Sequence, residues 1–443
     1  MGTAEKLYSV LMKRNFEAEQ AMPEKARRNL VPNGLRIILA NALQSSGDQT
    51  VNASTVLPWV FAAVGAPAAL TGMLVPIRES GSMLPQAFLT PLILRVRYRK
   101  RVFVAGALIQ SISVASMAAT AALAEGLAAG LLIILALMVF SFGRSLCSIS
   151  SKDVQGRTIP KGERGQINGL ATTAAGLVAI TLGLVIRIFG GEDLSAMQLA
   201  ALLALGAVLW SAVAAVYITI KEPADELPAD SSTNGVTVSD SGFAQIIKLM
   251  RDDVPFRQFV FVRSLLLVSS LSPPFIVTLS IQSGASALTG LGSFVIAAGL
   301  AALLGGRIFG RLADKSSRNL MSIGAGIASA IVISVVLIVS APGFTGEGFW
   351  GGMMFVIVYF LLTMMHTGVR VGRKTYIVDM AEGDLRTTYV SVSNTLMGLI
   401  LLLVGGISSL LAIIHISWAL LFLAGMGLLG VFAGKRLPDV SLQ

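Results

Sequence analysis

Cysteine and histidine are nearly absent from this chain. Its 443 residues include one cysteine, Cys147, and two histidines. The sequence therefore has no disulfide framework, no cysteine metal cluster and no conventional nucleophile–base set. No Gly-x4-Gly-Lys-Ser/Thr phosphate loop occurs, so ATP as a driving force is unsupported. We expect no metal and no cofactor, and an enzyme is a weak alternative.

Charged residues are also scarce, at 13% of the chain against 54% hydrophobic residues. Soluble domains carry roughly a quarter charged residues. Apolar runs recur here, each near the roughly 20 residues that cross a bilayer. We therefore expect an all-α membrane protein with about twelve transmembrane helices. The predicted spans are residues 35–62, 68–94, 102–124, 127–148, 166–188, 197–220, 257–282, 287–310, 319–341, 349–369, 389–411 and 414–434.

The positive charges, which give a net charge of +10, gather in alternate loops. Basic residues lie at 95–101, 152–164, 311–318 and 370–386, whereas the loops between these contain no Lys or Arg apart from Arg187. Basic loops stay in the cytoplasm. We therefore expect both termini to be cytoplasmic, in the plasma membrane or, in a bacterium, the inner membrane. The positive net charge is explained by this topology, so we expect no nucleic-acid partner.

One long polar stretch has the composition of a linker and divides the chain into two six-span halves. The predicted organisation is a cytoplasmic N-terminal segment at 1–34, a six-helix bundle at 35–220, a cytoplasmic linker at 221–256, a second six-helix bundle at 257–434 and a cytoplasmic tail at 435–443.

The N-terminal segment is polar, so we expect no cleaved signal peptide. Within it, Leu7–Phe16 forms a short amphipathic stretch with basic residues. This stretch either lies on the anionic inner leaflet of the membrane or is a solvated tail.

The two halves match each other by motif spacing. Lys152 precedes Arg164 by the same number of residues as Lys374 precedes Arg386. An even number of spans returns the chain to its starting side, so two six-span repeats share one orientation. Such pseudo-repeated bundles around a cavity suit alternating access.

Residues 310–318 read Gly-Arg-Leu-Ala-Asp-Lys-Ser-Ser-Arg. This run resembles the loop motif of the major facilitator superfamily, Gly-x-Leu-x-Asp-Arg/Lys-x-x-x-Arg/Lys, with the last basic residue one position early. The resemblance implies the twelve-helix fold of that family. It also implies that the motif locks the cytoplasmic helix ends in one state, through Gly310, Asp314, Lys315 and Arg318.

The first-half copy of the motif has Arg95 where the aspartate belongs. The contact that locks the cytoplasmic helix ends is therefore made mainly by the second half, or another pair of residues replaces it in the first half. The Gly-Pro antiporter motif of span 5 is missing as well, which removes the best ground for drug efflux.

Three ionisable residues lie near the membrane midplane by these spans: Asp48, Arg78 and Glu79. Charge at that depth is costly and marks a functional site by default. Arg78 suits an anionic group on a solute, and Asp48 or Glu79 could carry a proton. The alternative is an Asp48–Arg78 pair that only fastens spans 1 and 2. Their polar neighbours on the same helices are Asn41, Gln44, Asn52 and Ser82.

Other polar residues of the spans are weaker candidates. Arg144 in span 4 could serve the site or snorkel to the interface. Arg263 in span 7 has the same two interpretations. His366 in span 10 could titrate or simply form hydrogen bonds in the lining. Pro273-Pro274 predicts an interrupted or kinked span 7.

These features together favour a secondary active transporter that works as a monomer in the lipid bilayer by alternating access. Its solute is small, an anionic organic solute is slightly favoured because of Arg78, and proton coupling is expected. An exporter of drugs or amphiphiles is the alternative within transport. A non-transporting membrane sensor, which would bind a ligand without flux, is the alternative in another class.

Overall fold

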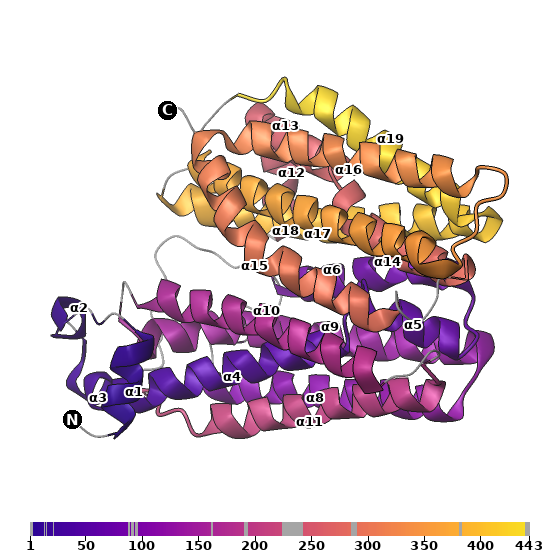
Figure 1. Cartoon of the computed structure of the whole chain (residues 1–443). Helices are drawn as coiled ribbons and strands as arrows, with labels where there is room; N and C mark the ends of the chain where they lie inside the picture. Colours follow the sequence, from indigo (N-terminus) through magenta and orange to yellow (C-terminus); the bar gives the residue numbers. More distant parts are fainter. Residues whose placement is uncertain are drawn as a thin grey trace.

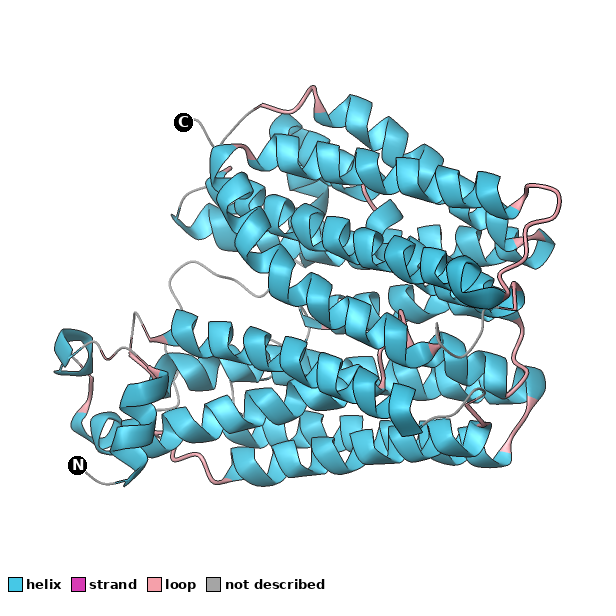
Figure 2. Cartoon of the chain, in the orientation of Figure 1, coloured by secondary structure: helices cyan, strands magenta, loops and turns pink. Residues whose placement is uncertain are grey.

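Helices make up every regular element of the described chain (Figure 2). The computed structural model describes residues 3–12, 14, 16–20, 22–86, 89, 93, 96–160, 163–189, 194–223, 242–284, 290–380 and 383–438. Helices satisfy their backbone hydrogen bonds internally, which is what a chain within lipid requires. The all-α membrane fold expected from the sequence is confirmed.

The helices fall into two bundles and a few short peripheral elements (Figure 1). The first bundle contains α4 (Leu30–Thr50), α5 (Val56–Ala63), η1 (Ala68–Leu70), α6 (Thr71–Met83), α8 (Arg99–Leu123), α9 (Gly126–Thr158), α10 (Arg164–Phe189) and α11 (Ala196–Ile218). The second contains α13 (Val254–Leu265), α14 (Val268–Gln282), α15 (Leu291–Lys315), α16 (Ser317–Val339), α17 (Gly348–Asp379), α18 (Gly383–Ile414) and α19 (Ile416–Gly434). The peripheral helices are α1 (Thr3–Leu11), α2 (Phe16–Gln20), α3 (Glu24–Arg28) and α12 (Gly242–Asp252).

Within the described residues, each predicted span overlaps one helix or a pair of helices, and α9 and α17 extend well beyond the predicted bounds. Eight of the described stretches are long and apolar enough to cross a membrane by length and composition, and two shorter apolar stretches lie in α10 and α15. Large apolar side chains such as Ile112, Leu135 and Leu410 stay exposed on the outer surface. An apolar exterior of this kind suits contact with lipid tails.

The first predicted span is broken into α4 and α5, which the sequence analysis did not predict. Between the two helices, the backbone N–H of Ser54 donates to Oδ1 of Asn52 at 2.9 Å. Such a local turn competes with helix formation. Pro58 adds to it, because proline has no N–H to donate to the carbonyl of Ser54 one turn earlier. The break exposes backbone and short polar side chains to the interior of the bundle.

The seventh predicted span is broken too, into α13 and α14, as the Pro273-Pro274 pair led us to expect. The position of the break differs from the prediction, because α13 ends at Leu265, the backbone leaves helical angles at Leu266, and both prolines lie inside α14. The prolines remove the donors that would reach the carbonyls of residues 269 and 270. The carbonyls that lose their helical hydrogen bonds therefore lie one turn before the prolines, next to the break.

The two bundles touch mainly along two helix pairs, α6 with α18 and α10 with α15, and α14 also contacts α6 and α5. Glycines allow the second pair to approach closely: a Cβ added at Gly292 would lie 2.5 Å from the carbonyl oxygen of Gly183. Gly72 of α6 faces Ser409 of α18 and Phe275 of α14 in the other bundle. These contacts lie at the right-hand end in Figure 1, opposite the end where α1–α3 and the C-terminus of α19 lie. The bundles diverge towards that other end.

The amphipathic N-terminal stretch is packed against the first bundle, which neither interpretation of the sequence anticipated. Tyr8 is fully buried, beside Gly34 of α4. Its hydroxyl donates to Glu163 at 2.6 Å. Burial and this hydrogen bond raise the pKa of Tyr8 above its ordinary value. Leu7 and Val10 on the outer side of α1 stay exposed.

Candidate functional site

A cavity of about 260 Å³ lies between the two bundles. Both helix breaks contribute to its wall, through Asn52 and Ser54 from one bundle and Leu267 and Ser270 from the other. Breaks in the first helix of each half thus meet at one site, as in transporters whose discontinuous helices form the binding site. Five charged side chains line the cavity: Arg78, Glu79, Arg263, Arg370 and Arg373.

Asp48 of α4 accepts hydrogen bonds from two arginines. Nη2 of Arg78 in α6 lies 3.2 Å from its Oδ1, and Nη1 of Arg144 in α9 donates to the same oxygen. The structure contains the Asp48–Arg78 pair that the sequence offered as an alternative to a functional role. Arg144, which the sequence offered as a weaker candidate or a snorkelling residue, completes the cluster. All three side chains are less than one third exposed, so the cluster is largely screened from water.

Glu79 follows Arg78 on α6 and lines the cavity. Within the described part of the chain its carboxylate has no hydrogen bond or ion pair. Ser82, by contrast, turns its hydroxyl back to the carbonyl of Glu79 at 2.8 Å and does not line the cavity. Of the polar neighbours on span 1, Asn52 lines the cavity, whereas Asn41 and Gln44 are half-buried on α4 outside the lining.

The α17 helix presents one continuous face to the cavity. Tyr359, Thr363, His366, Arg370 and Arg373 recur every three or four residues and all line it. This spacing places side chains on one side of a helix. His366 therefore belongs to the lining, as both of its sequence-based interpretations require.

Arg370 and Arg373 were assigned to a cytoplasmic loop in the sequence analysis, and that assignment is wrong. The α17 helix continues to Asp379, so both residues lie on a helix and in the cavity wall. The predicted span ended at residue 369 because basic residues were interpreted as loop. The three-and-four spacing from Tyr359 onwards was the signal that could have found them.

Arg263 of α13 is 7% exposed and lies between the cavity and α18. It donates to the hydroxyl of Ser393 at 2.5 Å and to Oδ1 of Asn394 at 3.2 Å. Its Nε is buried and has no hydrogen-bond partner among the described residues. This arginine is therefore oriented by neutral groups, and it is not snorkelling.

The motif predicted to gate the transporter lies where α15 ends and α16 begins. Gly310, Asp314 and Lys315 belong to α15, and their side chains lie outside the described part of the structure. Nη1 of Arg318 in α16 donates to the carbonyl of Leu437 beyond α19, at 2.9 Å. The gating role of this motif stays a prediction.

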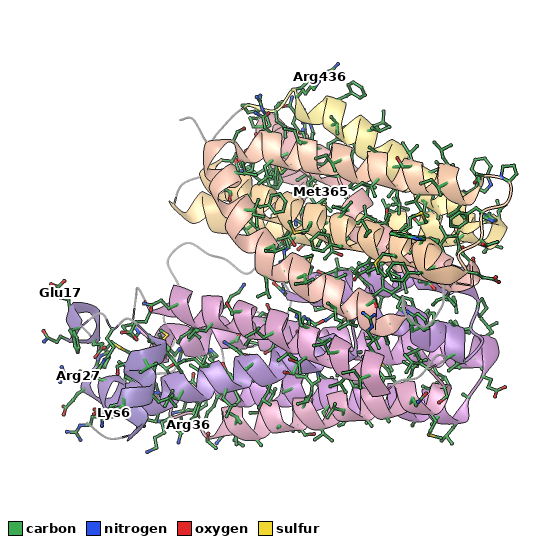
Figure 3. All side chains as sticks on the ribbon, in the orientation of Figure 1. Lys6, Glu17, Arg27, Arg36, Met365 and Arg436 are labelled. Carbon is green, nitrogen blue, oxygen red and sulfur yellow. The ribbon has the colours of Figure 1, made fainter. Side chains whose placement is uncertain are left out.

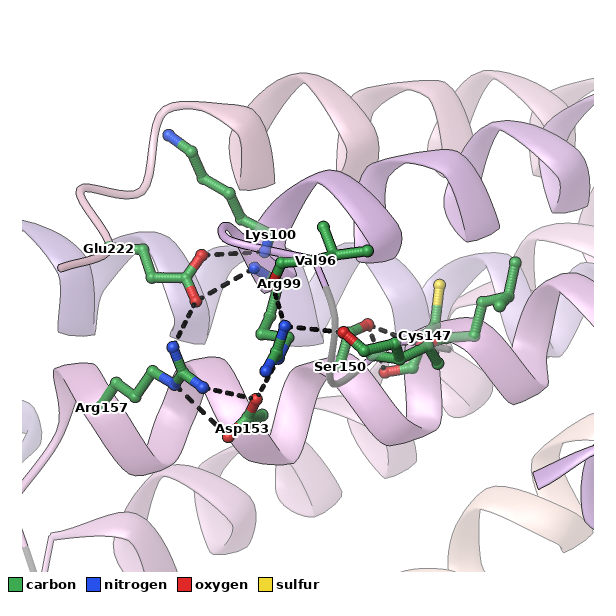
Figure 4. Close-up of polar contacts among 10 residues, drawn as sticks. Val96, Arg99, Lys100, Cys147, Ser150, Asp153, Arg157 and Glu222 are labelled. Carbon is green, nitrogen blue, oxygen red and sulfur yellow. Dashed lines mark hydrogen bonds and ion pairs between the residues drawn. The ribbon is translucent and has the colours of Figure 1, made fainter. Parts of the chain in front are cut away.

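The first half has a charged network at the corresponding place, shown in Figure 4. Arg99 at the start of α8 donates to Asp153 of α9 at 2.7 Å, and Arg157 donates to the same aspartate at 3.0 Å. Glu222, after α11, accepts from the backbone N–H groups of Arg99 and Lys100 at 3.2 and 2.9 Å. Burial raises the pKa of Glu222 above its ordinary value. These contacts join the cytoplasmic-side ends of α8, α9 and α11 predicted from the sequence, and whether they replace the gating contact of the first-half motif stays a prediction.

The match to a protein family extends over most of the chain. A family model described as Major Facilitator Superfamily covers residues 37–399. The chain belongs to the major facilitator superfamily. Membership in this superfamily identifies it as a secondary transporter of small solutes in a membrane, and not as an enzyme. No curated protein matches the facilitator.

Solved transporters share the fold of this facilitator at low sequence identity. A nucleoside transporter is 14% identical, with a TM-score of 0.70 over 91% of this chain and 99% of that chain. A D-xylose-proton symporter is 13% identical, with a TM-score of 0.69 over 92% and 98%. A POT family transporter in complex with a thioalcohol-conjugated peptide is 12% identical, with a TM-score of 0.68 over 94% and 98%. At such identities the likeness shows the fold alone.

Proposed function

We propose that this facilitator transports a small anionic organic solute by alternating access and couples the movement to protons. The observation that carries the proposal is the charge of the cavity between the bundles. Four arginines line it against one glutamate. Arginine cannot be deprotonated at working pH and binds carboxylates and phosphates through a planar fork. A neutral sugar or nucleoside would leave these charges unmatched.

The proton is assigned to Glu79. Asp48 already accepts from two arginines and serves to hold α4, α6 and α9 together. Glu79 lines the cavity and is free of such contacts within the described structure. A proton carrier has to exchange with water on each side in turn, and a cavity-lining carboxylate meets that requirement.

The distribution of basic residues supports a cytoplasmic location for both termini. Lys6, Arg27 and Arg36 lie at one end of the first bundle (Figure 3), and the basic residues at 95–101 and 152–164 belong to the same side of the membrane by the predicted topology. Basic segments stay on the cytoplasmic side. We assign the contacts between the bundles, at the opposite end, to the extracytoplasmic side. We assign the protein to the plasma membrane.

Export of drugs or amphiphiles is the second candidate, since Met83, Met397 and Leu401 also line the cavity. The arginines count against it, because binding an apolar solute would bury their charge without compensation. A sensor that binds without flux is distinguished by the transport measurement below.

The test is accumulation of radiolabelled organic anions by proteoliposomes under an imposed pH gradient of either polarity. We expect wild-type protein to accumulate an anion above its equilibrium level with one polarity. Glu79→Gln should lose this accumulation while keeping exchange of the solute between the two sides, because binding is separate from the proton step.

Glu17→Gln is the matched control and should behave as wild type, since Glu17 is exposed on α2 at the left-hand end in Figure 3 and does not line the cavity. Undiminished accumulation by Glu79→Gln would show that the proton is carried elsewhere. Binding of anions without any flux would favour the sensor.

A further inference from the structure

The charged side chains of the first bundle that line the cavity, Arg78 and Glu79, balance one another together with Asp48 and Arg144, which lie outside the lining. Asp48 accepts from Arg78 and Arg144, and Glu79 lines the cavity beside Arg78. Two carboxylates therefore accompany two guanidinium groups. This set carries no net formal charge and requires no bound anion to compensate it.

The second bundle contributes only positive charge to the same cavity. Arg263, Arg370 and Arg373 line it, and no carboxylate of this bundle lines it among the described residues. The hydrogen bonds of Arg263 go to the neutral side chains of Ser393 and Asn394, and its buried Nε has no partner in the part of the chain that the structure describes. Three guanidinium groups thus gather on one side of the cavity without a counter-charge from their own bundle.

The excess of positive charge on the second bundle bears on the charge of the solute. Charge within a membrane protein is costly unless it is paired, and a singly charged anion would pair only one of the three arginines. Arg370 and Arg373 are three residues apart on α17, so their side chains are neighbours on one face. Guanidinium groups placed in this way can engage several oxygens of one phosphate or carboxylate through bidentate hydrogen bonds.

We infer that the second bundle binds a solute group carrying at least two negative charges, of the phosphate-monoester or dicarboxylate type. The balanced set of the first bundle then serves coupling rather than recognition of this group. The inference rests on the proposed anion transport and narrows its substrate class. It assigns Arg263, Arg370 and Arg373 as the residues that determine specificity for a dianion over a monoanion.

The test compares matched anions that differ by one negative charge. Thermal stability of the purified full-length protein is measured at neutral pH and constant ionic strength with sulfate against methyl sulfate, succinate against succinamate, and glycerol 3-phosphate against its methyl diester. We expect at least one doubly charged member to stabilise the protein at about tenfold lower concentration than its partner, since each charge-assisted hydrogen bond lost weakens binding by about this factor or more.

Two variants and a control locate the effect. Arg370→Gln with Arg373→Gln should remove the preference for the dianion, and Arg263→Lys should reduce it. Neither Arg370 nor Arg373 has a hydrogen bond or ion pair in the described structure, so the double variant should fold, which its melting temperature without ligand verifies. Arg436→Gln, an exposed arginine of the same half outside the cavity, should keep the preference.

The outcomes separate this inference from the proposed function. Equal binding of both members in every pair that binds would overturn the dianion inference and leave anion transport standing. Binding of none of the six anions would overturn both. A preference that survives in the double variant would show that the doubly charged group binds away from α17.

Discussion

At the scale of single residues, Asp48 shows how far a sequence can locate a site. Its pairing with Arg78 followed from two adjacent spans of known direction, because both residues fall at the same membrane depth. Arg144 lies almost a hundred positions further along the chain, and nothing in the sequence gives the distance between α4 and α9. Both arginines donate to one carboxylate oxygen of Asp48. The double contact makes Asp48 the centre of the cluster.

The cluster leads to a ranking of stabilities. Asp48→Asn leaves two partly buried guanidinium groups without their carboxylate. Breaking a fully buried pair typically costs about 3–5 kcal/mol, so we expect a cost at or below that range. Arg78→Gln and Arg144→Gln should each cost less, since Asp48 keeps one arginine in either variant. Melting temperatures of the purified proteins measure the order.

The control for this ranking is Asp252→Asn, a matched change at an exposed position of α12, which should leave the melting temperature unchanged. If Asp48→Asn proves as stable as wild type, the cluster does not fasten the bundle and its charges serve the solute alone.

At the scale of helices, the positions of the spans were predictable and their internal breaks were less so. The spans follow from apolar length, which lipid imposes directly. The α4–α5 break depends on a side-chain hydrogen bond of Asn52, a local event that leaves the apolar pattern unchanged. The end of α17 was misplaced for a different reason. Arg370 and Arg373 have a hydropathy typical of a loop, whereas their spacing with His366 is that of a helix face.

At the scale of the whole molecule, the two halves repeat one plan. The first helix of each half is broken, and both breaks line the same cavity. The two halves were predicted from the linker and from motif spacing. The charge difference between them was not predictable, because it depends on which arginines face the cavity and which already have a partner.

The orientation of the molecule can be checked by labelling, because the one native cysteine, Cys147, is buried. Ala341→Cys lies in an exposed turn at the end opposite the termini, and Arg436→Cys is exposed near the end of α19. A membrane-impermeant maleimide applied to intact cells should label the first and spare the second. The reverse pattern would place the termini outside.

The most direct test of anion transport is to identify the solutes that the protein moves. Proteoliposomes are exposed to a mixed small-molecule extract under a pH gradient of either polarity, and their contents are then identified by mass spectrometry. We predict that wild-type vesicles become enriched in organic anions. Vesicles with Arg370→Gln and Arg373→Gln, or without protein, should not. Enrichment of neutral or cationic solutes by wild-type protein, with no anion among them, would contradict the account.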